Sequence, residues 1–116
     1  MKILVVDDDL HIQRLYKEEF EDEGYEVVIA SNGKEAIELF DREVPDIVTL
    51  DILLPDVDGI RLLRQMKEKR PKVPIIMSTA YDYRDDFAVW ASEAYIVKSS
   101  DLDELKSMIK KLLEKQ

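Results

Sequence analysis

The sequence has no cysteine among its 116 residues, which excludes disulfide bonds, thiolate metal sites and cysteine nucleophiles. Its single histidine, His11, has no acidic tether and is expected on the exposed start of the first helix. No apolar run approaches the roughly 20 residues that cross a bilayer, and no signal peptide is present. We therefore expect a cytoplasmic protein without membrane insertion.

Positive charge is also scarce, with 17 Lys and Arg against 26 Asp and Glu and a formal net charge of −9. This balance argues against direct nucleic-acid binding, which needs clustered cations to neutralise phosphates. The length fits one domain over residues 1–116, and 46% apolar residues supply its core. The chain ends with its last expected helix, so no attached effector domain is expected.

Five apolar runs alternate with segments of helical period, which predicts an α/β fold of parallel strands joined by right-handed crossovers. Strands are expected at 2–7, 26–30, 46–50, 73–78 and 94–98. Helices are expected at 10–22, 34–42, 59–69, 84–92 and 101–114. The third and fourth runs are apolar without alternation, as in strands that helices cover on both faces.

Three aspartates stand where apolar runs stop: Asp7 and Asp8 after the first run, and Asp51 after the third. Because the carboxyl ends of parallel strands meet at one edge of the sheet, we expect these carboxylates to converge. Two unit charges about 5 Å apart repel by about 3 kcal/mol at an effective dielectric of about 20. The cluster therefore predicts a site for a hard divalent cation, with Mg2+ as the expected ion.

Two further strand ends carry groups that suit a phosphoryl ligand. The fourth run ends at Ser78 and Thr79 and the fifth at Lys98, which supply hydroxyl and ammonium donors. Each residue alone has an ordinary structural interpretation: the acidic pair as decoration of a helix N-terminus, Thr79 as a strand former, Lys98 as a surface charge. Their joint spacing favours a phosphoryl site.

These groups fall within a longer pattern of segments: Val5-Val6-Asp7-Asp8, Leu50-Asp51, Leu54-Pro55, Asp58-Gly59, Ser78-Thr79-Ala80 and Tyr95-Ile96-Val97-Lys98. In this order and spacing the chain resembles the response-regulator receiver domains of two-component signalling over essentially its full length. The resemblance implies a flavodoxin-like (βα)5 three-layer sandwich. Its five-stranded parallel sheet would have the order 2-1-3-4-5.

The resemblance also implies a role for each acidic residue. Asp51 would be the phosphoacceptor, attacking the phosphorus of a phosphohistidine to form an acyl phosphate. Asp8, Asp51 and the backbone carbonyl of Leu53 would bind Mg2+ directly, and Asp7 would act largely through metal-bound water. The ion would offset charge on the carboxylate and on the transferred oxygens.

Thr79 and Lys98 would hold the remaining phosphoryl oxygens, and Tyr95 matches the family's switch aromatic. Phosphorylation would draw Thr79 toward the phosphoryl group and shift Tyr95 from outward to inward populations. The helix, strand and helix expected within 84–114 would then present a changed face to partners.

A sensor histidine kinase is the implied phosphodonor. It would dock on the first helix near Leu10, Ile12 and Gln13 and on the loop after Lys98. A histidine phosphotransferase or an effector protein would receive the signal, through protein contacts or onward phosphorelay.

The loops after the third, fourth and fifth strands bear on the lifetime of the phosphoryl group and on the placement of Lys98. Leu53 and Tyr81, two residues after Asp51 and Thr79, offer no carboxylate or amide to orient hydrolytic water, so slow self-hydrolysis is expected. The family usually has a cis proline where this chain has Ser99. A cis bond without proline costs roughly 3 kcal/mol, so that loop is either strained or trans.

The loop after Asp51 also invites local interpretation. Gly59 is interpreted as a backbone device for a turn with positive φ, and Pro55 as a residue that preorganises the loop. Asp56 to Gly59 resemble half of a calcium loop, but the remaining ligand positions are missing, so that interpretation is rejected.

Two rival functions come from other classes. A Mg2+-dependent aspartyl-nucleophile phosphohydrolase would need an acid/base Asp two residues after the nucleophile, where this chain has Leu53. A flavodoxin-like electron carrier would need a glycine- and hydroxyl-rich loop after the first strand, where Asp7-Asp8-Asp9 would repel a flavin phosphate. We therefore expect a phosphoacceptor that catalyses its own phosphorylation and slow dephosphorylation, and not an enzyme with separate substrates.

Overall fold

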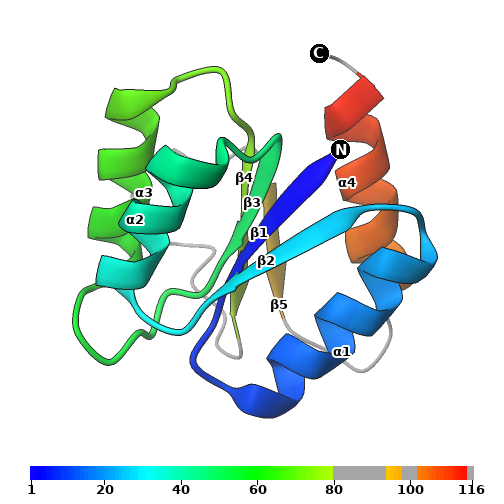
Figure 1. Ribbon diagram of the computed structural model, residues 1–116, viewed down its shortest axis with the longest axis horizontal. Coiled ribbons are helices and arrows are strands. Elements are labelled where there is room, and N and C mark those ends of the chain that lie inside the picture. The colour runs from blue at the N-terminus through cyan, green and yellow to red at the C-terminus, as the bar shows by residue number, and fades with distance from the viewer. Residues whose placement is uncertain (80–93, 98–101, 115–116) are drawn as a thin grey trace.

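The computed structural model describes residues 1–79, 94–97 and 102–114, with the backbone alone at 79, 94, 95 and 97. Strands and helices alternate along the chain (Figure 1). The described elements are β1 (Lys2–Val6), α1 (Leu10–Asp22), β2 (Glu26–Ala30), α2 (Gly33–Glu43), β3 (Ile47–Leu50), α3 (Gly59–Lys69), β4 (Ile75–Thr79), β5 (Ala94–Val97) and α4 (Asp103–Glu114).

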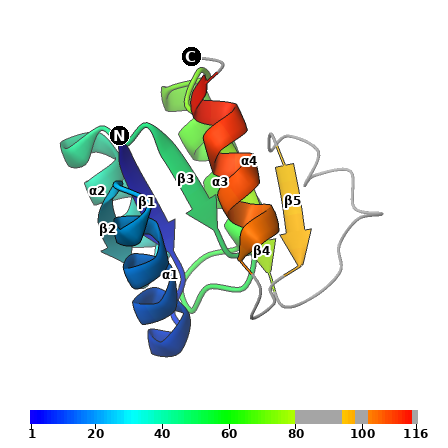
Figure 2. The ribbon, with the colours of Figure 1, turned by 90° about the vertical axis from the view of Figure 1, so that its right-hand side faces the viewer.

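The five strands form one parallel sheet in the order β2-β1-β3-β4-β5. α2 and α3 cover one face of the sheet, and α1 and α4 cover the other (Figures 1 and 2). The structure thus confirms the predicted three-layer sandwich and its strand order. Since every strand runs in the same direction, the carboxyl ends of β1, β3, β4 and β5 lie along one edge.

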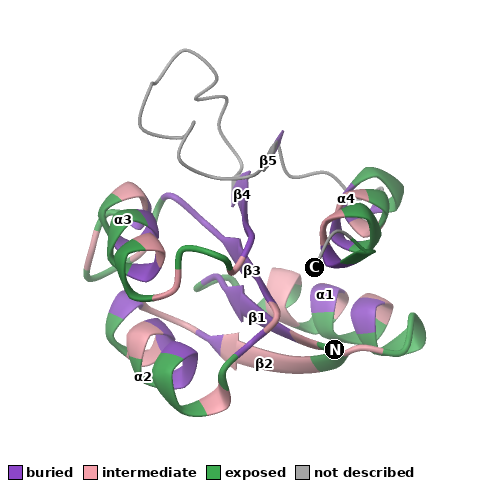
Figure 3. Cartoon of the chain, turned by 90° about the horizontal axis from the view of Figure 1, so that it is seen from above, coloured by how far each residue is buried: buried purple, intermediate pink, exposed green. Residues whose placement is uncertain are grey.

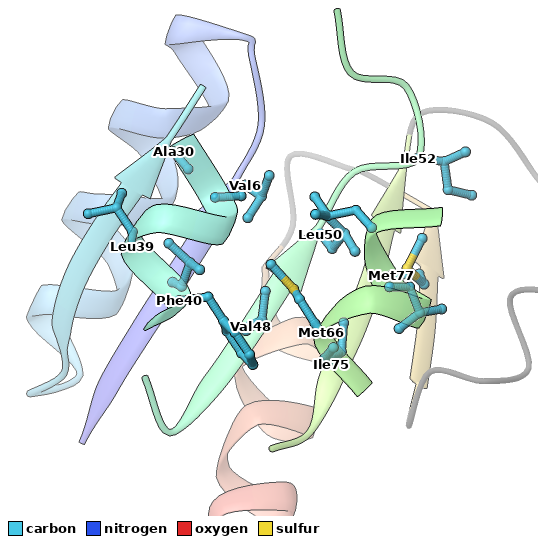
Figure 4. Packing of buried hydrophobic residues seen from close by; sticks show 14 residues of the cluster. Val6, Ala30, Leu39, Phe40, Val48, Leu50, Ile52, Met66, Ile75 and Met77 are labelled. Carbon is cyan, nitrogen blue, oxygen red and sulfur yellow. The ribbon is translucent and has the colours of Figure 1, made fainter. Parts of the chain in front are cut away.

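Both faces of the central strands are buried, as expected for a covered parallel sheet. In β1, Leu4 and Val6 pack into the cluster beneath α2 and α3, whereas Ile3 and Val5 pack into the cluster beneath α1 and α4. Figure 4 shows the first cluster, where Phe40 of α2 lies near strand side chains. The buried stripes of the helices face inward in Figure 3. This two-sided core fixes the strand ends on which the site depends.

Short polar side chains start three helices. Asp9, Asn32 and Asp58 are the N-caps of α1, α2 and α3, and each accepts a hydrogen bond from a backbone N–H of the first helical turn. Gly24, after α1, has φ 93°, a left-handed conformation that glycine adopts without a side-chain clash. Each cap therefore defines where a strand-to-helix loop ends.

Element boundaries differ from the sequence prediction mainly at β4, which begins at Ile75 rather than at residue 73. Pro74 precedes it and has no N–H to donate to a ladder, although its carbonyl accepts from Val48 N at 3.1 Å. The predicted helix 84–92 lies outside the described residues. No helix in the part of the chain that the structure describes has the length and apolar character that a bilayer crossing requires.

Candidate functional site

The acidic cluster lies at the carboxyl edge of the sheet, between β1 and β3. These strands pair in parallel with Val6 opposite Leu50. The next residues, Asp7 and Asp51, therefore leave the sheet side by side. The N–H of Asp51 donates to the carbonyl of Val6 at 3.0 Å and extends this pairing by one residue. Pairing of the two strands therefore brings the acidic loops together.

The three predicted carboxylates meet as expected. Asp7, Asp8 and Asp51 each offer an oxygen, and these oxygens lie within 4.8 Å of one another. Asp7 and Asp51 are 2% and 6% exposed, whereas Asp8 is exposed. Oxygen ligands of one magnesium ion stand about 2.0–2.1 Å from the metal and therefore at most about 4.2 Å apart, so small side-chain movements, or a water between one carboxylate and the metal, would let these oxygens hold one ion. The donor set contains hard oxygens only, which suits Mg2+ and not a thiophilic metal.

The backbone of Leu53 lies beside the cluster. Its N–H donates to Asp51 Oδ1 at 3.3 Å, and the residue forms an isolated antiparallel bridge with Asp58. The Leu53 side chain is 48% exposed, so it points outward rather than into the core. This placement next to Asp51 is compatible with a liganding role for the Leu53 carbonyl.

Gly59 has a different purpose from the one expected. Its backbone does not have positive φ, so the turn interpretation was wrong. Instead, the Gly59 N–H donates to the Ile52 carbonyl at 2.8 Å, and an added Cβ would lie 2.2 Å from the Asp51 carbonyl oxygen. The absence of a side chain lets the start of α3 pack directly against the backbone that carries the central aspartate.

An acidic residue does stabilise the N-terminus of the first helix, but it is Asp9 and not Asp7 or Asp8. Asp9 is the N-cap of α1, accepting from His11 N at 2.8 Å and Ile12 N at 3.3 Å. The Asp9 N–H in turn donates to Asp7 Oδ1 at 2.9 Å. Capping by Asp9 leaves the Asp7 and Asp8 carboxylates to the cluster.

Two polar residues near the site were missed from sequence. The Gln13 side-chain amide donates to the carbonyl of Asp7 at 2.6 Å and to Ser31 Oγ at 3.0 Å. Gln13 is predicted to lie on the docking surface for the kinase, and in the structure its side-chain amide points toward the acidic loop. A polar residue on the first turn of a helix after an acidic loop is the only local signal for this role.

Asp56 is the second missed residue. Its carboxylate accepts from Gly33 N at 2.8 Å and from Lys34 N at 3.1 Å, across 23 and 22 positions of sequence. The Gly33 N–H is the main cause that holds the pKa of the Asp56 carboxyl below its ordinary value, because the hydrogen bond favours the charged form. Asp56 therefore ties the loop after β3 to the N-terminus of α2.

The remaining predicted site residues are only partly described. Thr79 ends β4 and pairs with Val97, and Tyr95 of β5 pairs with Met77. The side chains of Thr79 and Tyr95 lie outside the described part of the chain. Lys98, Ser99 and Tyr81 also lie outside the described residues, so the predicted ammonium donor, the peptide after it and the residue beside the water path stay predictions.

Comparison with known proteins agrees with this geometry. The sequence profile of the response regulator receiver domain matches residues 3–110. Sporulation initiation phosphotransferase F of Bacillus subtilis is 36% identical over 97% of this chain and 93% of its own length. Regulatory protein AtoC of Escherichia coli is 36% identical over 99% of this chain but only 26% of its own length. For most of the curated relatives named by the comparison, the chain spans about a quarter to a half of their length.

Solved structures match equally well. Response regulator protein TrrA of Thermotoga maritima, in complex with Mg(2+)-BeF, is 45% identical, with a TM-score of 0.92 over 96% of this chain and 97% of that chain. The same protein in complex with histidine kinase ThkA superposes with a TM-score of 0.91, at 45% identity over 97% of each chain. By fold, acidic site and sequence, the chain belongs to the family of response regulator receiver domains, the phosphoacceptor domains of two-component signalling.

Proposed function

We propose that Asp51 accepts a phosphoryl group from the phosphohistidine of a sensor histidine kinase in a Mg2+-dependent reaction. The observation that carries this assignment is the convergence of the Asp7, Asp8 and Asp51 oxygens within 4.8 Å, with Asp51 buried at the end of β3. Burial separates Asp51 from the exposed Asp8 but not from Asp7, which is also buried, and the match to the receiver-domain family supports Asp51 as the modified residue.

The chemistry is a displacement at phosphorus. An oxygen of Asp51 forms the new P–O bond while the P–N bond to histidine breaks, and the leaving electron pair stays on the imidazole. Mg2+ held by Asp8, Asp51 and the Leu53 carbonyl, and by Asp7 through water, would offset the negative charge of the carboxylates and of the transferred oxygens.

We assign the remaining phosphoryl contacts to Thr79 and Lys98. Thr79 ends β4, which pairs with β3, and its partner Val97 immediately precedes Lys98. This pairing supports delivery of a hydroxyl and an ammonium to the edge that carries Asp51. Neither group needs to move a proton, because phosphoryl transfer depends mainly on positioning and electrostatics. Tyr95 would respond to the movement of Thr79 as the switch residue.

The proposed kinase surface surrounds the acidic cluster. Among the described residues, only four large hydrophobic side chains are markedly exposed, and two of them, Leu10 and Leu53, follow the acidic residues of the β1 and β3 loops. Leu10 belongs to the predicted docking surface on α1, and exposed apolar side chains beside a buried nucleophile suit a partner that must exclude water during transfer. The complex of TrrA with a histidine kinase supports the class of partner.

We further propose that residues 1–116 act as one receiver domain, as the profile match over 3–110 supports, and that the protein acts in the cytoplasm. The signal would pass to a histidine phosphotransferase or an effector protein through the face built on the helix predicted at 84–92, β5 and α4. The protein would not turn over separate substrates, since Leu53 occupies the place where an aspartyl phosphohydrolase needs its acid/base carboxylate.

The test is incubation with Mg2+ and acetyl phosphate, followed by mapping of the modified peptide by mass spectrometry. Modification should appear at residue 51 of the parent protein, and should disappear with EDTA and in Asp51→Asn. Asp41→Asn is a matched control, because Asp41 is an exposed carboxylate on α2 in contact with Lys69. Steady hydrolysis of a phosphate ester would instead favour the phosphohydrolase, and a yellow purified protein would favour the flavodoxin alternative.

A further inference from the structure

Residues 31–34 join β2 to α2 and include the first two residues of that helix. They contribute no predicted ligand, yet they touch both acidic loops. Figure 1 shows the loop that follows β3 passing beside the first turn of α2. The loop after β1 reaches the same turn through Gln13 of α1. We call residues 31–34 the 31–34 turn.

On one side the 31–34 turn is bound to the loop that carries Leu53. Both oxygens of Asp56 accept backbone N–H groups of the turn, Gly33 at 2.8 Å and Lys34 at 3.1 Å. The packing here is equally close, because a Cβ added to Gly33 would lie 2.0 Å from Val57 Cγ1. Two hydrogen bonds and the close packing of Val57 against Gly33 fix this loop against α2.

On the other side the 31–34 turn is bound to the loop that carries Asp7. The Gln13 amide donates to the Asp7 carbonyl at 2.6 Å and to Ser31 Oγ at 3.0 Å. The turn itself is stiffened, because Ser31 N donates to Glu35 Oε1 at 3.1 Å and Glu35 N donates to Asn32 Oδ1 at 2.8 Å. These bonds resemble a capping box, except that the Glu35 side chain accepts from the residue before the N-cap, and they restrict the conformation of the turn.

We infer that the 31–34 turn, held by Asp56 and Gln13, sets the spacing between the two acidic loops and thereby the affinity of the site for Mg2+. Asp56 and Gln13 are positioning residues, which touch neither metal nor phosphoryl group. The inference rests on the proposed function, since it concerns the same metal site.

The physical reason is the strict geometry of magnesium. The ion needs near-ideal octahedral placement of its oxygen ligands, so a loop that can drift loses affinity without losing any ligand. Strand pairing fixes Asp51 itself, but Leu53 lies beyond the end of β3. The loop from Leu53 to Asp58 is held by the Leu53–Asp58 bridge and by Asp56.

The experiment measures Mg2+ binding to the unphosphorylated protein by calorimetry, with amide NMR of Gly33 and Lys34 during the same titration. Replacing a direct partner of a metal ligand typically lowers affinity 10–100-fold. Asp56 bonds to Gly33 and Lys34 and acts on the site only through its loop, so Asp56→Ala should raise the Kd about tenfold, at the lower end of that range. Asp56→Asn keeps one acceptor oxygen and should raise it less, by about threefold. In the parent protein the Gly33 and Lys34 amide signals should shift with Mg2+, and this response should vanish in Asp56→Ala.

Asp46→Ala is the matched control. Asp46 also accepts a backbone N–H, from Lys2 at 2.7 Å, but at the opposite edge of the sheet. Removal of the Asp46 carboxylate should leave the Kd for Mg2+ within about twofold of the value for the parent protein. This result would separate general destabilisation from loss of positioning. The double variant Gln13→Ala with Asp56→Ala should be less impaired than the product of the two single effects, because both act through one turn.

Two results would overturn the inference while leaving the proposed function intact. In the first, Asp56→Ala and Asp56→Asn bind Mg2+ as tightly as the parent protein, and the two amides still respond. In the second, Asp46→Ala weakens binding as much as Asp56→Ala does. Failure of the proposed function has a different signature, because the parent protein itself would then bind no Mg2+ or would not be modified at Asp51.

Discussion

The hydroxyls of Tyr16 and Ser78 share a hydrogen bond of 2.8 Å inside the core, where both residues are 2% exposed. The bond joins α1 to β4, one residue before Thr79. A buried hydroxyl that loses its partner incurs a desolvation cost of about 1–3 kcal/mol. This pair therefore stabilises the arrangement of α1 against the strand that ends at the site.

We expect Tyr16→Phe to lower the free energy of unfolding by about 1–2 kcal/mol, because the Ser78 hydroxyl loses that partner. Urea denaturation followed by circular dichroism measures the change. Adding Ser78→Ala to Tyr16→Phe should cost less than the sum of the two single changes. Additive losses would mean that the hydrogen bond contributes little.

Thr49 presents the opposite case in β3. Thr49 is 1% exposed. Its hydroxyl is buried and has no hydrogen-bond partner, and no other buried side-chain polar group in the described part of the chain is in this position. Thr49→Val replaces that hydroxyl with a methyl of similar size and should raise the free energy of unfolding by about 1 kcal/mol. Thr49→Ser keeps the hydroxyl, loses a methyl and should be destabilising. A less stable valine variant would argue against this account.

Val44 follows α2 with φ 46°, a left-handed conformation that is unfavourable for a β-branched residue. It is 58% exposed, so little buried surface is lost when it is replaced. Val44→Gly should raise the unfolding free energy by about 0.5 kcal/mol, after the higher entropy of glycine in the unfolded chain is deducted. Thermal unfolding checks this change, and Val44→Ala, which keeps the strained conformation, should give no comparable gain.

The Asp56 carboxyl should make the free energy of unfolding depend on pH. Its pKa is lowered in the folded protein from the ordinary value of 3.8, chiefly by the Gly33 N–H. The stabilisation that the charged Asp56 carboxylate provides is thus fully present above its pKa in the unfolded chain. This stabilisation is lost as the pH falls through the pKa of Asp56 in the folded protein. We expect the stability difference between the parent protein and Asp56→Asn to shrink as the pH is lowered below about 4. Urea titrations at several pH values test this, and a difference that grows in acid would contradict it.

The fold and the acidic cluster could be predicted because their signals are local. Apolar runs alternate with helical periods, and Asp7, Asp8 and Asp51 each stand next to a run, so parallel pairing alone brings them together. The start of β4 was misplaced because the apolar run begins at residue 73, while Pro74 lacks the N–H that a ladder requires.

The residues that support the cluster could not be predicted in the same way. Ser31, Gly33 and Ser78, which bond Gln13, Asp56 and Tyr16, lie 18, 23 and 62 positions away in sequence, so no local pattern indicates these contacts. Only the bond from Gln13 to Asp7, six positions away, has a local signal. Gly59 was recognised as a special position, but for the wrong reason. Its close approach to Ile52 depends on how α3 meets the loop, which no turn rule describes.

The most direct test of the account is a crystal structure of the protein with Mg2+ and beryllofluoride, a phosphoryl mimic. Beryllofluoride should be bonded to an Asp51 oxygen. One metal ion should contact the Asp8 and Asp51 carboxylates and the Leu53 carbonyl, and should be linked to Asp7 through water. A mimic bonded to another residue, or an ion bound away from these three aspartates, would contradict the account.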